Sequence, residues 1–234
     1  MHRTTVLKAL VKSIPVQNYL EIGVDRGEIF YQIEAPLKIA IDPHFNMSKG
    51  QRIKNKFLKG HYFFEITSDA FFSTQQSFLK EHPIDLAFVD GLHTYKQCLT
   101  DILNCLNYLT PQGYIVVHDV NPPNEVSAYP VKSDRDEMKE TNIKDKYKYW
   151  TGSWTGDVWK AIAHMRAVRN DLHIFTLDAD WGIGIIRWGN PENKVAIPLE
   201  DIERADYTFF ANHRYELLNL KPSHYFFEFI GQEK

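Results

Sequence analysis

Residues 86–123 contain three side chains that can exchange protons or bind cations, and two of them close apolar runs. Asp90 ends "LAFVD" and Asp119 ends "YIVVHD", while His93 follows the first acid by three positions. An imidazole titrates near neutral pH and can act as a general base, whereas a carboxylate can bind a cation or hold a polar substrate. These residues are therefore the first candidates for chemistry.

Further acids accompany the other apolar runs, with Glu21 in "YLEIG", Asp42 ending "IAID" and Asp69 shortly after "HYFFEI". Most of these runs are continuously apolar, as strands covered on both faces require. The predicted parallel strands are 16–23, 37–42, 61–66, 84–90 and 113–119. Parallel strands point their carboxyl ends to one edge of a sheet, where ligands bind, so we expect the acids to converge there.

Helical patterns separate the strands, at 68–82 and 94–109. The second carries an apolar stripe that we expect to pack in the core, formed by Leu99, Ile102, Leu103, Leu106 and Leu109. A helix over 157–170, an antiparallel hairpin of 172–178 with 181–189, and a last helix over roughly 198–220 follow. The pattern predicts an α/β fold, with a doubly wound, mostly parallel seven-stranded sheet that ends in an antiparallel hairpin.

The chain is expected to form one domain, 1–234, with a C-terminal helical extension over 195–234. Residues 121–157 are polar, contain prolines and then aromatic residues, so we expect a lid or insert there. Five aromatic residues can either line a substrate wall or pin this segment to the core: Tyr147, Tyr149, Trp150, Trp154 and Trp159.

The composition of the chain limits the classes of binding partner to expect. The chain has 234 residues, 44% of them hydrophobic, and a net charge of -3 with mixed signs, which favours small polar partners over nucleic acid or membrane. The first residues have no signal-peptide core, so we expect a cytoplasmic protein, and a homo-oligomer is left open. Cys98 and Cys105 are seven residues apart on a predicted helix, about 10 Å, so free buried thiols are expected.

The loop "EIGVDRG" indicates which kind of ligand binds at the carboxyl edge of the predicted sheet. Gly23 permits a tight turn and Gly27 permits close approach of backbone to a ligand. The spacing is not the G-x-G-x-x-G of dinucleotide-binding loops, and the acids Glu21 and Asp25 favour a cationic ligand. Asp42 follows Gly23 by 19 residues, at a position where an acid accepts the hydroxyls of a ribose.

In these segments the chain resembles the class I S-adenosylmethionine-dependent methyltransferases. "YLEIGVDRG" resembles their glycine motif, "IAIDP" their ribose-binding acid and "TSDAFF" their adenine loop, and the similarity spans about residues 16–190. "DGLHTY" followed by "GYIVVHD" is similar to the metal-dependent macrolide and sugar O-methyltransferases and the cephalosporin hydroxylase type group.

The resemblance implies a role for each matching residue. S-adenosylmethionine would contact Glu21, Gly23, Gly27, Asp42, Ser68 and Asp69. Asp90 and Asp119 would bind Mg²⁺ or another divalent metal, and His93, with Asp90, would be catalytic, the histidine as general base. His118 stands where those relatives tend to carry an acid, which weakens a magnesium site or shifts it toward a softer ion.

The acceptor implied is a small hydroxylated metabolite or a sugar. A protein of the same fold that binds a nucleotide, or serves as a scaffold, without turnover is the alternative.

Overall fold

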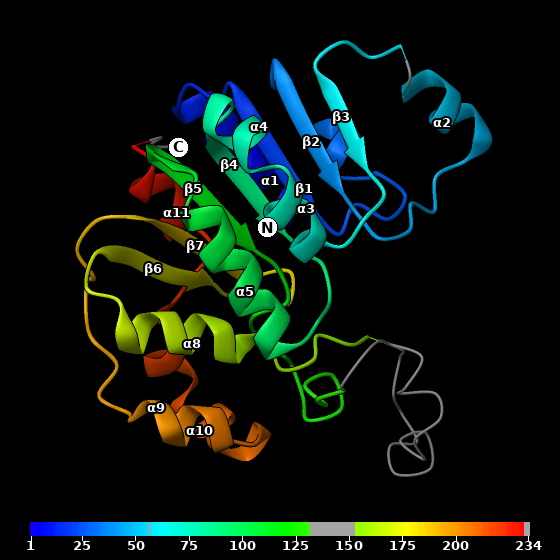
Figure 1. Cartoon of the computed structure of the whole chain (residues 1–234). Helices are drawn as coiled ribbons and strands as arrows, with labels where there is room; N and C mark the ends of the chain where they lie inside the picture. Colours follow the sequence, from blue (N-terminus) through cyan, green and yellow to red (C-terminus); the bar gives the residue numbers. More distant parts are fainter. Residues whose placement is uncertain (56, 132–152, 232–234) are drawn as a thin grey trace.

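The computed structural model describes residues 1–55, 57–131 and 153–231, which build one mixed sheet with helices on both faces (Figure 1). Within these residues the sheet has eight strands in the order β3-β2-β1-β4-β5-β7-β6-β8. The parallel strands are β1 Asn18–Ile22, β2 Leu37–Ile41, β3 His61–Phe64, β4 Ile84–Val89 and β5 Leu109–Val117. The predicted parallel sheet is confirmed.

The antiparallel part also follows the prediction and adds one strand. β6 Leu172–Leu177 pairs with β7 Ile183–Trp188, and β7 pairs antiparallel with β5. β8 Leu220–Lys221 lies parallel to β6 and makes eight strands where seven were predicted. Its two residues are too few to give an alternating or apolar run in the sequence.

Two apolar layers enclose the sheet. On one face, α1 Arg3–Ser13, η1 Phe30–Gln32 and α11 Tyr225–Phe229 contribute buried residues such as Leu10, Phe30 and Phe226. The helices of the other face are α3 Ser68–Thr74, α4 Gln76–Glu81, α5 Tyr95–Leu106, α8 Trp159–Val168, α9 Leu199–Arg204 and α10 Tyr207–Leu218. α2 Lys49–Asn55 lies beyond the β3 edge (Figure 1).

The helix predicted over 94–109 was too long. It ends at Leu106, and Leu109 instead begins β5, where it pairs with Ile84. Ile102 and Leu106 are buried as expected, but Leu103 is 41% exposed, so that part of the predicted core stripe is wrong. A periodic run of leucines does not show where a helix gives way to a strand.

The C-terminal helix predicted over roughly 198–220 is two helices. α9 ends at Arg204, and Asp206 starts α10 by accepting a hydrogen bond from the backbone N–H of Phe209 at 2.8 Å. This acid is an N-cap, which favours a new helix start over continuation. Phe210 then packs on Trp159 with 4.6 Å between ring centroids, so the C-terminal extension shares the core of the sheet.

The predicted lid, 121–157, lies partly outside the described residues, because 132–152 are not described. It stays a prediction. Of the five aromatic residues named for a substrate wall, Tyr147, Tyr149 and Trp150 also lie outside the described part. Trp159 is 1% exposed in the core, which contradicts a place in that wall and agrees with the alternative, a contact with the core.

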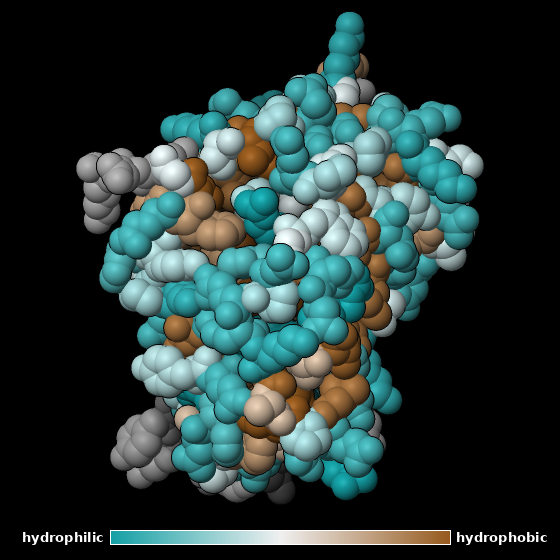
Figure 2. Space-filling model, turned by 90° about the vertical axis from the view of Figure 1, so that its left-hand side faces the viewer, coloured by the Kyte–Doolittle hydropathy of each residue, from teal (hydrophilic) through white to brown (hydrophobic). Residues whose placement is uncertain are grey.

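The surface is mixed in character. Hydrophilic side chains cover most of the face in Figure 2, and hydrophobic side chains show between them in smaller areas. In the described ranges, no helix has both the length and the apolar character needed to span a bilayer. Cys98 and Cys105 are buried free thiols, as expected.

Glu21 is a buried acid within β1. Its side chain accepts a hydrogen bond from the Tyr19 hydroxyl, and the residue is 2% exposed. Burial raises the pKa of Glu21 to about 8, although the bond from Tyr19 acts in the opposite direction. The folded protein therefore holds a proton on this carboxyl that the unfolded chain releases at lower pH.

We predict that stability falls as pH rises from about 5 to 8, partly because of Glu21. A folded-state pKa above the unfolded value means that the native state binds more protons in this window, so unfolding becomes easier with rising pH. Glu21→Gln should flatten this fall, measured by denaturant unfolding at pH 5, 6.5 and 8. The exposed Glu81→Gln should not, and an equally steep fall in both variants would exclude this origin.

Candidate functional site

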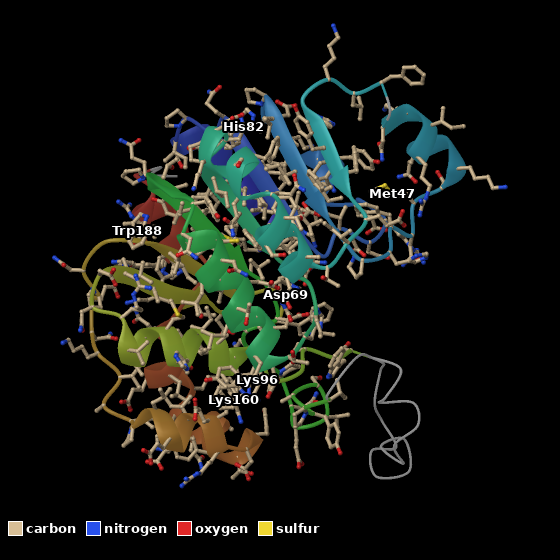
Figure 3. The ribbon with its side chains drawn as sticks, viewed as in Figure 1. Met47, Asp69, His82, Lys96, Lys160 and Trp188 are labelled. Atoms are coloured by element: carbon tan, nitrogen blue, oxygen red, sulfur yellow. The ribbon has the colours of Figure 1, made fainter. Side chains whose placement is uncertain are left out.

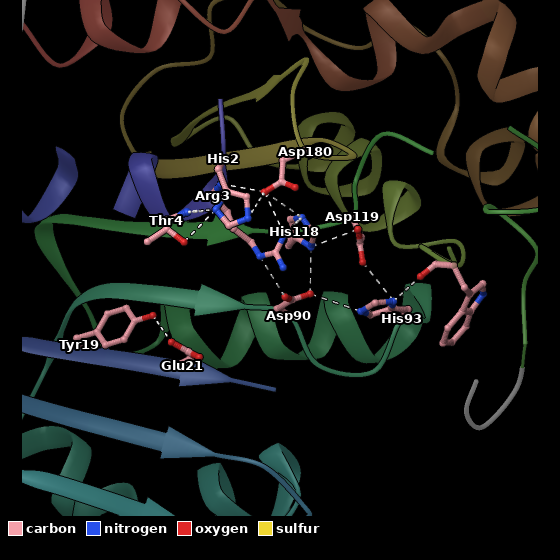
Figure 4. A network of polar contacts seen from close by, with 11 residues as sticks. His2, Arg3, Thr4, Tyr19, Glu21, Asp90, His93, His118, Asp119 and Asp180 are labelled. Atoms are coloured by element: carbon pink, nitrogen blue, oxygen red, sulfur yellow. Dashed lines mark hydrogen bonds and ion pairs between the residues drawn. The ribbon is translucent and has the colours of Figure 1, made fainter. Parts of the chain in front are cut away.

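The carboxyl edge of the sheet brings together the three residues first singled out (Figure 4). Asp90 directly follows β4 and Asp119 lies two residues beyond β5, the neighbouring strand. His93 Nε2 lies 3.5 Å from Asp90 Oδ1, and His93 Nδ1 lies 3.3 Å from Asp119 Oδ2. The predicted clustering is therefore present.

Trp154 holds His93 in one orientation. His93 Nδ1 lies 2.9 Å from the Trp154 carbonyl oxygen, and a carbonyl only accepts, so in the neutral imidazole Nδ1 carries the proton and Nε2 has the lone pair. Gly156 has φ +60°, and a Cβ there would lie 1.8 Å from the carbonyl oxygen of His93, so glycine permits this close packing. Burial lowers the pKa of His93, but Asp90 and Asp119 outweigh burial and raise it.

His118 lies at the centre of the network. Its Nδ1 is 3.2 Å from both Asp90 Oδ1 and Asp119 Oδ1, and its Nε2 is 3.1 Å from Nη1 of Arg3. Burial raises the pKa of Asp90, but its contacts with His118 and His93 hold that pKa below the ordinary value. The imidazole thus stands between the two carboxylates.

Arg3 and Asp180 complete the network and were not predicted. The backbone N–H and Nη1 of Arg3 donate to Asp180 Oδ2 at 2.9 and 3.0 Å, and Arg3 Nε lies 3.9 Å from Asp90 Oδ2. The pair is separated by 177 positions in the chain. No local pattern joins the start of α1 to the β6–β7 turn, so sequence reasoning had no signal for this contact.

Backbone strain collects at the same place. Five non-glycine residues of the described chain have positive φ, and four of them surround this network: Asp25 at 47°, Asp119 at 62°, Asp180 at 49° and Trp181 at 56°. Residues in such sparsely populated conformations are concentrated at functional sites. The positive φ values therefore indicate a functional site at this edge of the sheet, and this evidence does not depend on the charged side chains.

Two cavities open at this edge. The first, about 680 Å³, is lined by the His93 network together with Trp154 and Trp181. The second, about 480 Å³, is lined by Asp42, Ser68 and Asp69. Five residues line both cavities: Gly23, Asp25, Asp90, Gly91 and Leu92. The cavities therefore adjoin at Gly23 and Asp90, where a molecule bound in one can contact a molecule bound in the other.

The Gly23 turn is where the cavities join. Gly23 has φ +84°, and a Cβ on it would lie 2.0 Å from the carbonyl oxygen of Asp90. The Asp42 carboxylate accepts hydrogen bonds from the backbone N–H of Asp25 and of His44, both at 2.8 Å, and so fixes two loops around the second cavity. Both residues thus lie where a cofactor loop and its acid are predicted.

Ser68 and Asp69 line the second cavity at the start of α3, where Figure 3 labels Asp69. Gln97 Nε2, which has two N–H donors, lies within hydrogen-bond distance of three acceptors: Ser68 Oγ at 3.2 Å, Asp69 Oδ1 at 3.1 Å and Asp101 Oδ1 at 3.1 Å. Burial raises the pKa of Asp101 to about 6. Gln97 and Asp101 were missed, although their i, i+4 spacing on the predicted helix, which places them on one face, was a usable signal.

Glu21 and Gly27 differ from the other predicted cofactor residues, since they line neither cavity. The Glu21 side chain bonds Tyr19 (Figure 4), and a Cβ on Gly27 would lie 2.6 Å from the ring of Tyr31. Packing thus accounts for Gly27 as fully as a ligand would. Their cofactor contacts stay predictions.

Asp90, His93 and Asp119 also fit a divalent cation. One donor atom from each lies within 4.8 Å of the others, and Asp119 Oδ1 is buried without a hydrogen bond from any described residue. Two carboxylates and one imidazole suit Mn²⁺ or Zn²⁺ better than Mg²⁺, which prefers oxygen. His118 Nδ1 competes with such an ion, because it lies 3.2 Å from both acids.

Comparison with known proteins agrees with this geometry. Residues 20–120 match a family model described as a methyltransferase domain. No curated protein sequence matches the chain. A candidate O-methyltransferase from Klebsiella pneumoniae superposes with a TM-score of 0.54 at 16% identity, covering 80% of each chain.

Two further structures share the fold. A candidate caffeoyl-CoA O-methyltransferase from Staphylococcus aureus gives a TM-score of 0.51 at 18% identity, over 81% of this chain and 85% of that one. The methyltransferase PaMTH1 of Podospora anserina, bound to S-adenosylhomocysteine, gives 0.50 at 15% identity, over 79% and 76%. Residues 20–120 therefore match a methyltransferase domain, and the chain shares the Rossmann-like fold of these methyltransferase structures.

Proposed function

We propose that the protein transfers the methyl group of S-adenosylmethionine to a hydroxyl of a small metabolite or sugar. The observation that carries the proposal is the pair of cavities that meet above Gly23 and Asp90. One of them has the acid at the ribose position, Asp42, and the other has the imidazole, His93. Cofactor and acceptor would then be in contact where the cavities join.

The second cavity suits the cofactor. Asp42 would hold the ribose, and Ser68 with Asp69 would contact the adenine, as in the family that the motifs resemble. The methionine end would lie toward Gly23, beside Asp25 and Asp90, whose carboxylates favour a positively charged sulfonium. The S-adenosylhomocysteine bound to the Podospora anserina protein supports this cofactor.

The first cavity suits an alcohol acceptor. S-adenosylmethionine supplies an activated methyl group, so the protein must align the acceptor and remove its proton. His93 Nε2 has the lone pair for that proton, while Asp119 and the Trp154 carbonyl hold Nδ1–H and stabilise the imidazolium that forms. The Staphylococcus aureus and Klebsiella pneumoniae proteins are both described as candidate O-methyltransferases, which supports transfer to oxygen.

A divalent metal, where bound, would be held by Asp90 and Asp119 and would lower the pKa of a nearby hydroxyl. His93 Nε2 can serve as a ligand or as the base, but one lone pair cannot do both. We assign Nε2 to the base, so the metal ligands proposed are the two carboxylates.

A binding protein without turnover is the second candidate. His118 Nδ1 lies 3.2 Å from both Asp90 Oδ1 and Asp119 Oδ1, so these two acids are already paired within the protein. This pairing competes with a metal or an acceptor for the acids and favours a site that binds without reacting. Cofactor binding with no methyl transfer to any hydroxylated acceptor would support it.

We predict that Asp42→Ala weakens S-adenosylmethionine binding by about 1.5 to 3 kcal/mol, because the ribose would lose charge-assisted hydrogen bonds. Isothermal titration calorimetry measures this directly. Glu65→Ala is the matched control, since that acid follows β3 and lines neither cavity. Equal affinity of Asp42→Ala and the wild type would remove the ribose assignment.

We predict that His93→Ala lowers kcat by about 10²- to 10⁴-fold, because the proton would have no acceptor in the first cavity. Affinity for S-adenosylhomocysteine should stay unchanged, since His93 does not line the second cavity. His164→Ala is the control, a histidine that bonds Tyr95 outside both cavities. Turnover of His93→Ala close to that of the wild type would exclude the general base.

We predict that a chelator lowers the activity and that Mg²⁺ or Mn²⁺ restores it, because the two carboxylates proposed as ligands offer oxygen atoms, which both ions bind. Elemental analysis of the treated protein must confirm that metal has been removed. Full activity of the metal-free protein would leave Asp90 and Asp119 as residues that orient His93 and the substrate.

A further inference from the structure

Trp181 occupies an unusual turn between β6 and β7. Asp180 and Trp181 both have positive φ, 49° and 56°, and the N–H of Gly182 donates to the carbonyl of Ala179 at 2.8 Å. Two consecutive positive φ values are typical of the type I′ turn, whose central positions strongly prefer Asn, Asp and Gly. Asp180 fits that preference, but Trp181 does not.

The fold gains little from this tryptophan. A bulky side chain in the left-handed region is a true outlier and costs about 1 to 2 kcal/mol. Trp181 is nevertheless 45% exposed, and no described residue accepts a hydrogen bond from its indole nitrogen. Asn would satisfy the backbone at this position with less strain, so packing does not explain the residue.

The turn is fixed from two sides, so the ring has a defined place. Asp180 accepts two hydrogen bonds from Arg3, and the Trp181 carbonyl accepts one from the backbone N–H of Asn121 at 2.7 Å. A Cβ on Gly182 would lie 2.4 Å from Asn121, which shows how closely the turn packs on the segment after β5.

The ring of Trp181 forms part of the wall of the acceptor cavity. The centroids of the Trp181 and His118 rings are 6.3 Å apart, at an interplanar angle of 71°. Trp181 also lines the same cavity as His93. Trp154 lines that cavity too, but its indole nitrogen donates to the carbonyl of Tyr129 and its own carbonyl binds His93. Trp154 therefore has structural contacts that Trp181 lacks.

We propose that Trp181 determines acceptor specificity by stacking on the face of a ring whose edge hydroxyl is directed to His93. This inference rests on the proposed methyltransferase function and names its substrate class. An indole face binds the flat apolar face of an aromatic or pyranose ring, while the carboxylates and imidazoles of the wall bind hydroxyls at the edge of that ring. An acyclic polyol offers the hydroxyls but no face.

Binding of three probes to the protein, with and without S-adenosylhomocysteine, tests the proposal by NMR titration: catechol, methyl β-D-glucopyranoside and glycerol. Trp181→Asn should weaken binding of the ring probe by about tenfold to 100-fold and leave glycerol within about twofold. Its melting temperature should equal or exceed that of the wild type, because Asn tolerates the left-handed backbone. Tyr215→Ala, which removes an exposed aromatic ring from α10, should change neither quantity.

Binding of catechol alone would identify a planar aromatic acceptor, and binding of the glucopyranoside alone would identify a sugar. Unchanged ring binding in Trp181→Asn, equal loss for glycerol, or no ring binding to the wild type would each overturn the proposal. Methyl transfer to the same probes is assayed separately. Ring binding that depends on Trp181, without any transfer, would count against the proposed catalytic function and leave the stacking role intact.

Discussion

The close approach of the Gly23 turn to the backbone of Asp90 is the constraint on which the candidate site depends. β1 and β4 are neighbours in the sheet, and any side chain at Gly23 would run into the Asp90 carbonyl. Because the two loops touch, Gly23 and Asp90 line both the cavity that contains Asp42 and the cavity that contains His93. A residue with a Cβ at position 23 would separate the loops and with them the two cavities.

The carboxylates of the first cavity explain why its residues come from so many elements. Asp90, Asp119 and Asp180 place three carboxylates close together, and such a group is costly to hold ionised unless partners surround it. Arg3 from α1 and His118 from the end of β5 supply those partners. His93 can remain an accessible base because other groups stabilise the acids around it.

Much of the fold follows from sequence, because most parallel strands are short apolar runs, and each is followed within two residues by an acid or a glycine. The same reasoning placed Asp42, Asp90 and Asp119 at one edge, since the direction of the strands alone brings them there. It failed where a contact depends on distant elements, as for Arg3 with Asp180, and where leucine periodicity ran past the end of α5 into β5. Backbone φ values, which single out Trp181, leave no pattern in the sequence unless the residue is glycine.

The distribution of strain links these points. Of the residues with left-handed backbone other than glycine, Asn219 ends α10 and so has a role in the fold, whereas Asp25, Asp119, Asp180 and Trp181 all lie at the cavity edge. Asp accepts this conformation more readily than other residues do, and here it also places a carboxylate where the network uses it. Trp181 lacks that tolerance, and its described contacts are the ring of His118 and a backbone bond from Asn121 that needs no indole. Strain that the fold does not require is best explained by a ligand that does require it, and the open face of this indole is where that ligand would bind.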